Sequence, residues 1–127
     1  MPHILIDYSS GADKVVDMAQ LVEAVHRAAR SSGYFPPTVL RTLARGADYS
    51  LVADENPLNQ FVQITVRMAP GRSREARKAL SQAIFDAASA TIPEAWSRGR
   101  FALRVDITES DPELSSQRNL LPKAGDG

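Results

Sequence analysis

The stretch MPHILIDY (residues 1–8) begins with Met-Pro and runs at once into apolar residues. Ile4, Ile6 and Tyr8 alternate with more polar positions, and this spacing of two predicts a β-strand. Most domains leave their first few residues loose, whereas a strand that starts at residue 2 holds the beginning of the chain inside the fold. We therefore expect Pro2 to occupy a structured position.

Pro2 can carry chemistry of its own if Met1 is removed, because the chain then begins with a secondary amine. An α-amino group has an ordinary pKa near ~8, and burial or a neighbouring cation lowers it. An amine moved towards neutrality is a general base that needs no side chain. The alternative is that Pro2 simply permits removal of Met1 and takes no part in catalysis.

The chain after this strand shows helical and then strand-like spacing. A turn cluster precedes an apolar stripe of helical period, which predicts a helix over Lys14–Arg30 with Asp13 as its N-cap. Pro36-Pro37 prevents the helix from continuing. A second strand is predicted from Thr38 to about Arg45. An excursion follows over residues 46–57, with a short extended piece over residues 49–52.

The same pattern then begins again. Alternation predicts a strand over Phe61–Met68, and Ser73 caps a helix from Arg74 to about Thr91. Pro93 ends this helix, and a last strand is expected over Arg100–Thr108. Gly11 and Gly71 stand at equivalent turns of the two halves.

The chain is therefore strand–helix–strand twice, over about residues 1–57 and 58–114, with a C-terminal tail, in one domain of residues 1–127. Each unit should pair parallel strands, and both helices must lie on one face to share a core. The prediction is an α/β (α+β) fold with a four-stranded mixed sheet and two helices on one face. The other face is then exposed to solvent or packed against other subunits. It carries Gln63, Thr65, Arg67, Arg104, Asp106 and Thr108.

Composition excludes several functional classes. Lysine plus arginine and aspartate plus glutamate number 15 each, so no overall charge favours nucleic acid or an anionic membrane. The chain has no cysteine, which removes disulfides and thiol chemistry. No signal peptide or membrane-spanning run is evident. We expect a cytoplasmic protein without nucleic-acid or membrane partners.

Two arginines are candidate anion ligands. Arg41 sits within the predicted second strand among apolar residues and must either find an anion or emerge on an exposed face. Arg72 directly precedes a helix, whose N-terminus favours an anion, although it could equally be a surface residue. His3 could line a cavity that Pro2 faces. Neither His3 nor His26 has a partner at metal-ligand spacing, so we expect no metal site.

Taken together, three short motifs resemble the 5-carboxymethyl-2-hydroxymuconate isomerase family of the tautomerase superfamily. They are Met1-Pro2-His3, residues 33–36 (GYFP) leading to Arg41, and residues 71–73 (GRS). The resemblance spans nearly the whole chain, whereas the excursion at 46–57 and the tail from Ser115 match poorly.

The resemblance implies a homotrimer that uses no cofactor and has active sites near subunit boundaries. It implies that Pro2 acts as the base and that Arg41 and Arg72 bind carboxylates of the substrate, a small unsaturated polycarboxylate such as 5-carboxymethyl-2-hydroxymuconate. Two alternatives stay open: a related proline-dependent lyase or hydratase, and a non-catalytic trimeric binding protein on the same scaffold.

Overall fold

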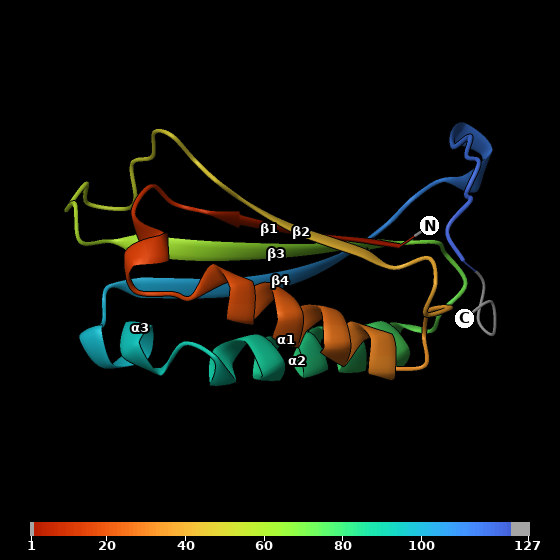
Figure 1. Cartoon of the computed structure of the whole chain (residues 1–127), viewed down its shortest axis with the longest axis horizontal. Coiled ribbons are helices and arrows are strands. Elements are labelled where there is room, and N and C mark those ends of the chain that lie inside the picture. The colour runs from red at the N-terminus through yellow and green to blue at the C-terminus, as the bar shows by residue number, and fades with distance from the viewer. Residues whose placement is uncertain (1, 123–127) are drawn as a thin grey trace.

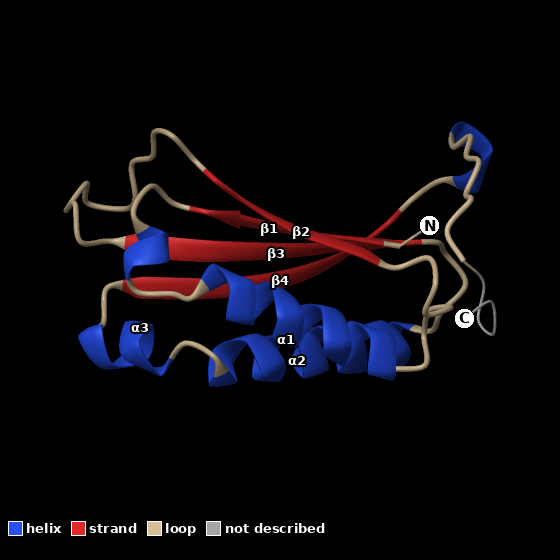
Figure 2. Cartoon of the chain, in the orientation of Figure 1, coloured by secondary structure: helices blue, strands red, loops and turns tan. Residues whose placement is uncertain are grey.

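The structure is a computed structural model that describes residues 2–122 of the 127. Met1, on whose removal the basicity of Pro2 depends, and residues 123–127 of the predicted tail lie outside the described part. The elements form two layers, a sheet and a layer of helices (Figures 1 and 2).

The sheet has four strands in the order β2-β1-β3-β4. The pairs β1–β2 and β3–β4 are parallel, while β1 and β3 run antiparallel in the centre. Each parallel pair belongs to one strand–helix–strand unit, which confirms the predicted tandem repeat and mixed sheet. The strands are β1 (His3–Tyr8), β2 (Arg41–Gly46), β3 (Gln60–Met68) and β4 (Phe101–Glu109).

The two long helices, α1 (Met18–Ser31) and α2 (Arg74–Ala90), lie side by side on one face of the sheet, as predicted (Figure 1). The inward residues of β1 and β3 meet the apolar stripes of both helices, and burial of this apolar surface stabilises the fold. The largest fully buried side chains in this core are Ile4, Ile6, Leu21, Ile64, Leu80, Ile84 and Ile92.

The predicted start of α1 at Lys14 with Asp13 as N-cap is wrong. Residues 12–14 form a 3-10 turn instead, and α1 begins four residues later at Met18. Asp17 is the N-cap, and its Oδ1 accepts a hydrogen bond of 3.1 Å from the backbone N–H of Gln20. Both aspartates precede helical spacing, but Ala12 is completely buried and the turn that begins there is closed by its own hydrogen bonds.

Three further expectations about the elements need correction. The second strand begins at Arg41 and not at Thr38, because the Pro36 carbonyl accepts the Val39 N–H at 3.2 Å and forms a turn there. Arg41 is therefore the first residue of β2 and does not lie mid-strand. The segment at 49–52 forms no strand. Pro93 ends α2 and also opens a short helix, α3 (Pro93–Arg98), in the first-turn position where proline is tolerated.

The face of the sheet opposite the helices has no covering layer within residues 2–122 (Figure 1). Its side chains come from the alternate positions of each strand, and they include the polar set on β3 and β4 that the sequence placed there. No helix in this part of the chain is long and apolar enough to cross a membrane.

Candidate functional site

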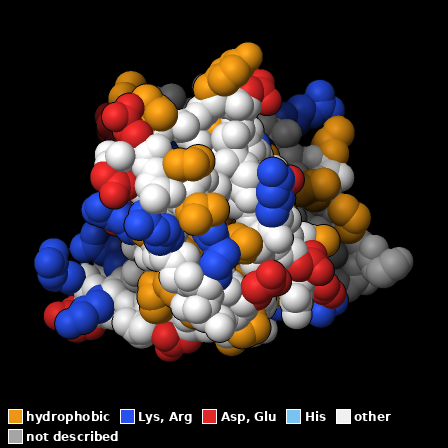
Figure 3. Space-filling model, turned by 90° about the vertical axis from the view of Figure 1, so that its left-hand side faces the viewer, with side chains coloured by type: hydrophobic (Ala, Val, Ile, Leu, Met, Phe, Trp, Pro, Cys, Tyr) orange, Lys and Arg blue, Asp and Glu red, His pale blue; other side chains and the backbone are white. Residues whose placement is uncertain are grey.

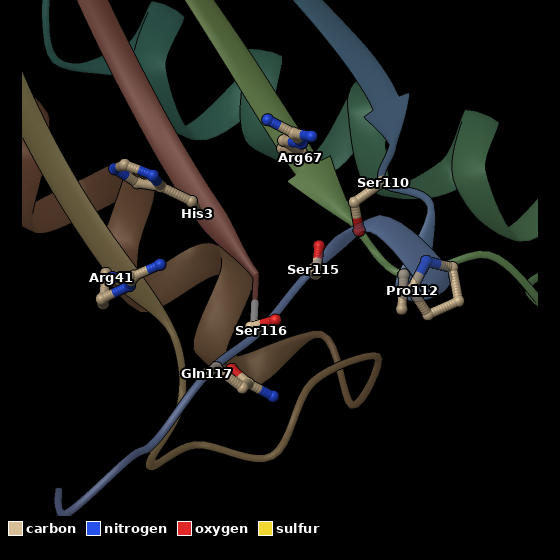
Figure 4. A pocket seen from close by; sticks show the side chains of 9 residues that line it. His3, Arg41, Arg67, Ser110, Pro112, Ser115, Ser116 and Gln117 are labelled. Atoms are coloured by element: carbon tan, nitrogen blue, oxygen red, sulfur yellow. The ribbon is translucent and has the colours of Figure 1, made fainter.

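A cavity of about 400 Å³ opens at the end of the sheet where β1 and β2 begin and β3 and β4 end. Figure 4 shows His3 between Arg41 and Arg67 on neighbouring strands, with the segment after β4 along another side. The lining residues are His3, Arg41, Arg67, Ala69, Ser110, Pro112, Ser115, Ser116 and Gln117. The cavity therefore combines cationic and neutral polar side chains.

The three basic residues form one row across the sheet. His3 on β1 is in register with Arg41 on β2 and with Arg67 on β3. Residues directly opposite each other on paired strands point to the same face. Because the next residue, Ile4, is buried in the core, this row lies on the open face. At the usual spacing of strands the backbones of the two arginines are about 10 Å apart.

The two arginines of this row lack a counter-charge. Within residues 2–122 neither the Arg41 nor the Arg67 side chain has a hydrogen-bond or ion-pair partner. The arginines farther along the same face do: Arg45 binds Asp7 with Nε–Oδ1 at 2.8 Å, and Arg104 binds Asp106 with Nε–Oδ2 at 3.0 Å. Among the described residues of the open sheet face, the arginines without an ion pair are therefore those of the row at the cavity, and this row can attract an anion.

His3 adds a neutral polar group to this row. Partial burial lowers the pKa of His3 below its ordinary value of 6.5, and the positive charges of Arg41, Arg45 and Arg67 lower it further. A neutral imidazole has one N–H donor and one acceptor nitrogen. His3 can therefore bind a substrate oxygen between the two arginines without adding a third charge.

Pro2 is buried directly before His3. Its carbonyl oxygen accepts a hydrogen bond of 3.3 Å from the backbone N–H of Arg41. Pro2 is not itself among the residues that line the cavity, but His3 and Arg41, its covalent and hydrogen-bonded neighbours, both are. The structure thus brings two of the three predicted site residues, Pro2 and Arg41, together at one end of the sheet.

Arg72 lies at the same end of the molecule but does not line this cavity. Its Nη2 donates a hydrogen bond of 3.0 Å to the carbonyl oxygen of Tyr34, and its guanidinium sits 5.6 Å from the centre of the Tyr34 ring. Both contacts hold the exposed Arg72 side chain against the turn that follows α1. The predicted N-cap Ser73 is confirmed, because its side chain accepts a hydrogen bond of 3.1 Å from the Ala76 N–H.

Sequence reasoning missed two parts of the cavity. The alternation in the sequence predicts Arg67 on the open face but gives it no role, and Arg67 becomes a site candidate only once the register places it opposite His3. The sequence predicts residues 115–117 as part of the C-terminal tail, whereas in the structure they line the cavity. Upstream of this segment, the Ser110 N–H donates a hydrogen bond of 2.8 Å to the Met68 carbonyl and holds the chain after β4 at the end of β3. No periodic pattern in the sequence predicts this return of the chain.

The opposite end of the molecule carries exposed apolar side chains in separate patches among charged ones (Figure 3). Tyr49, Leu51, Leu58 and Trp96 are exposed there. None of the predicted site residues lies at this end. Among the described residues no group of three or more histidines and carboxylates could hold a metal ion.

Comparison with known proteins gives the family. A family model described as 5-carboxymethyl-2-hydroxymuconate isomerase matches residues 2–123. The 5-carboxymethyl-2-hydroxymuconate Delta-isomerase of Escherichia coli is 24% identical over 119 residues, which are 94% of each protein. A crystal structure of 5-carboxymethyl-2-hydroxymuconate delta-isomerase superposes with a TM-score of 0.85 at 24% identity, covering 94% of this chain and 89% of that one.

A more distant structure, a fused 4-OT protein described as a symmetric trimer, has a TM-score of 0.66 at 15% identity and covers 91% of this chain and 93% of its own. The family match covers nearly the whole chain and agrees with the predicted resemblance. The chain belongs to the 5-carboxymethyl-2-hydroxymuconate isomerase family, a family of isomerases.

Proposed function

We propose that this protein isomerises a small unsaturated polycarboxylate such as 5-carboxymethyl-2-hydroxymuconate without a cofactor, and that Pro2 is its general base after removal of Met1. The observation that carries the proposal is the hydrogen bond between Pro2 and Arg41, because it joins the proposed base to the cationic row at the cavity. The membership of the chain in the isomerase family supports the type of reaction.

In the proposed reaction Pro2 accepts the proton of the dienol hydroxyl and returns a proton to a carbon of the same conjugated system. Electron density moves along the conjugated chain, and the hydroxyl carbon becomes a carbonyl. The proton count is unchanged, so no external oxidant or reductant is needed. Arg41 binds a carboxylate and favours the negative charge that develops on the enolate oxygen, a preorganised electrostatic effect. Its positive charge also lowers the pKa of the Pro2 amine.

Arg72 is the second proposed carboxylate-binding residue. Its place in the GRS motif, directly before Arg74 at the start of α2, supports this role. Its guanidinium contacts the Tyr34 carbonyl, so substrate binding there requires that a carboxylate replace or share this partner. A guanidinium has five N–H donors and can bind a carboxylate while it keeps one bond to the carbonyl.

We also propose that the protein is a homotrimer with active sites near subunit boundaries. The uncovered sheet face and the trimer named for the fused 4-OT structure support this assembly. Size-exclusion chromatography with light scattering tests it. A mass three times that of the 13.8 kDa chain is expected, and a monomeric mass at enzymatically active concentrations contradicts it.

The reaction is tested by following 5-carboxymethyl-2-hydroxymuconate in D2O by NMR with the purified protein. The expected product is the isomeric ketone, with deuterium at the carbon that receives the proton. A product that has lost carbon dioxide or gained water indicates a lyase or hydratase and contradicts the proposal. Tight binding of the substrate without turnover, by protein whose Met1 is confirmed absent by mass spectrometry, indicates a binding protein and contradicts it as well.

A further inference from the structure

We propose that Arg67 is a further carboxylate-binding residue of this cavity, so that the row Arg41–His3–Arg67 holds two carboxylates of one substrate molecule. The inference deepens the proposed function and rests on it for the identity of the substrate. It assigns the cavity to a compound with at least two carboxylates, one on each side of His3. It also gives a specificity role to a residue outside the predicted site.

The register of the sheet places Arg41 and Arg67 on either side of His3. His3 is opposite Arg41 on one side and opposite Arg67 on the other, so both arginines flank the same histidine on the same face. Their side chains line one cavity (Figure 4). The gap of about 10 Å between their backbones can be filled by two inward-leaning guanidinium groups and a small dicarboxylate.

The second observation is the distribution of carboxylates around the cavity. Among the described residues that line the cavity there is no aspartate or glutamate. Glu109 lines a neighbouring cavity together with His3 and Arg67, but its Oε1 is bound to Arg77 Nη1 at 3.0 Å. Within residues 2–122, two guanidinium groups thus share this cavity without a carboxylate in its lining to balance their charge, and a dianion from solution can supply that balance.

The other walls of the cavity suit the same kind of ligand. Ser110, Ser115, Ser116 and Gln117 contribute hydroxyl and amide groups that donate hydrogen bonds to carboxylate oxygens. His3 can donate an N–H in its neutral form. A bidentate arginine–carboxylate contact fixes both the position and the orientation of a planar group. Two such contacts at either end of one molecule fix its direction in the cavity.

The test combines a charge-removing variant with a series of substrates. Arg67→Gln is compared with wild type on 5-carboxymethyl-2-hydroxymuconate and on analogues in which one carboxylate at a time is converted to its carboxamide. With the parent substrate, kcat/KM is expected to fall about 10- to 100-fold, because a charge-assisted hydrogen bond is lost. With one analogue the loss is expected to shrink to less than about 3-fold, because wild type no longer has that contact either.

Two control variants accompany this test. Arg67→Lys keeps the charge and is expected to retain more activity than Arg67→Gln. Arg27→Gln removes the same charge from an exposed ion pair on α1 and is expected to leave every kcat/KM value unchanged. Circular dichroism and thermal unfolding confirm that the variants are folded. An equal loss with the parent and all analogues, or no loss at all, overturns the inference.

A separate binding measurement distinguishes failure of the inference from failure of the proposed function. If wild type isomerises none of the compounds, the proposed function fails, and calorimetric binding of cis,cis-muconate tests the row directly. Binding by wild type that is at least 10-fold weaker in Arg67→Gln, and unchanged in Arg27→Gln, supports the two-carboxylate row. Absence of binding, or equal affinity of wild type and Arg67→Gln, contradicts it.

Discussion

The backbone N–H of Arg41 donates a hydrogen bond of 3.3 Å to the carbonyl oxygen of Pro2. This bond extends the parallel pairing of β1 and β2 by one residue beyond the His3–Arg41 pair. It therefore fixes the beginning of the chain against the first residue of β2. The sheet, and not a flexible loop, thereby fixes the backbone of Pro2 relative to the backbone of Arg41.

The first prediction concerns Pro2. Pro2→Ala is expected to lower kcat by about 10²-fold or more, because positioned acid–base catalysis contributes ~10²- to 10⁴-fold. KM should change much less, since the arginines proposed to bind the carboxylates remain. Steady-state kinetics measures both constants, and mass spectrometry verifies that Met1 is absent from both proteins. Unchanged turnover in the variant removes Pro2 from the mechanism.

The second prediction concerns Arg41. Arg41→Ala is expected to reduce kcat/KM about 10- to 100-fold, because a charge-assisted hydrogen bond to a carboxylate is lost. The bond to Pro2 should persist in this variant because it uses the backbone. Arg41→Lys, which keeps the charge without the bidentate fork, should fall between the two. If Arg41→Ala has wild-type kinetics on the same substrate, the carboxylate role of Arg41 is wrong.

The third prediction concerns the pH dependence of stability. The pKa of His3 is lowered in the folded protein, first by burial and then by Arg41, Arg45 and Arg67. Between 6.5 and that lower pKa the unfolded chain binds more protons than the folded chain, so the free energy of unfolding decreases as the pH falls through this window. Above pH 6.5 His3 is largely neutral in both the folded and the unfolded chain, so it adds little to the pH dependence of the free energy of unfolding.

Urea unfolding measured from pH 8 to pH 5 checks this slope. In His3→Asn the part of the slope that comes from His3 should disappear. His26→Asn is the matched control, because it removes the other histidine of the chain and should keep that part. A slope that is the same in wild type and His3→Asn would show that burial and the neighbouring arginines do not lower the pKa of His3 as described.

The fourth prediction concerns the core between the helices and the sheet. Ile84 on α2 is completely buried, and Ile84→Ala should lower the free energy of unfolding by about 2–5 kcal/mol. Leu114 is 85% exposed, and Leu114→Ala should change it by less than about 0.5 kcal/mol. Urea unfolding of both variants tests whether α2 shares the core. Equal effects of the two substitutions contradict the packing described.

Most of the fold could be predicted because hydrophobic spacing reports which side of an element faces the core. The alternation in β3 and the apolar stripe of α2 are both visible in the sequence, and both elements were confirmed. The predicted ends of elements were wrong where local hydrogen bonds decide which of two nearby residues begins or caps the element. Asp13 and Asp17 are chemically equal as N-caps, and only the turn at residues 12–14 selects Asp17.

The candidate site was predictable only in part. Pro2 could be selected because it directly precedes the first predicted strand, and Arg41 because a guanidinium among apolar residues of a predicted strand needs an anion. Arg67 could not, because its place beside His3 depends on the antiparallel register of β1 and β3, which hydrophobic spacing does not determine. The contact of Arg72 with the Tyr34 carbonyl also joins residues far apart in sequence. Side-chain partners of this kind follow from the folded geometry alone.

The central claim is that Pro2 provides an uncharged amine next to cationic side chains, and ¹⁵N NMR of protein labelled with ¹⁵N-proline tests it most directly. The account predicts one proline nitrogen that titrates as an amine with a pKa below the ordinary value of about 8. Arg41→Ala should raise that pKa, because a neighbouring positive charge is removed. If no proline nitrogen titrates, or if one titrates with an ordinary pKa that does not respond to Arg41→Ala, the claim is contradicted.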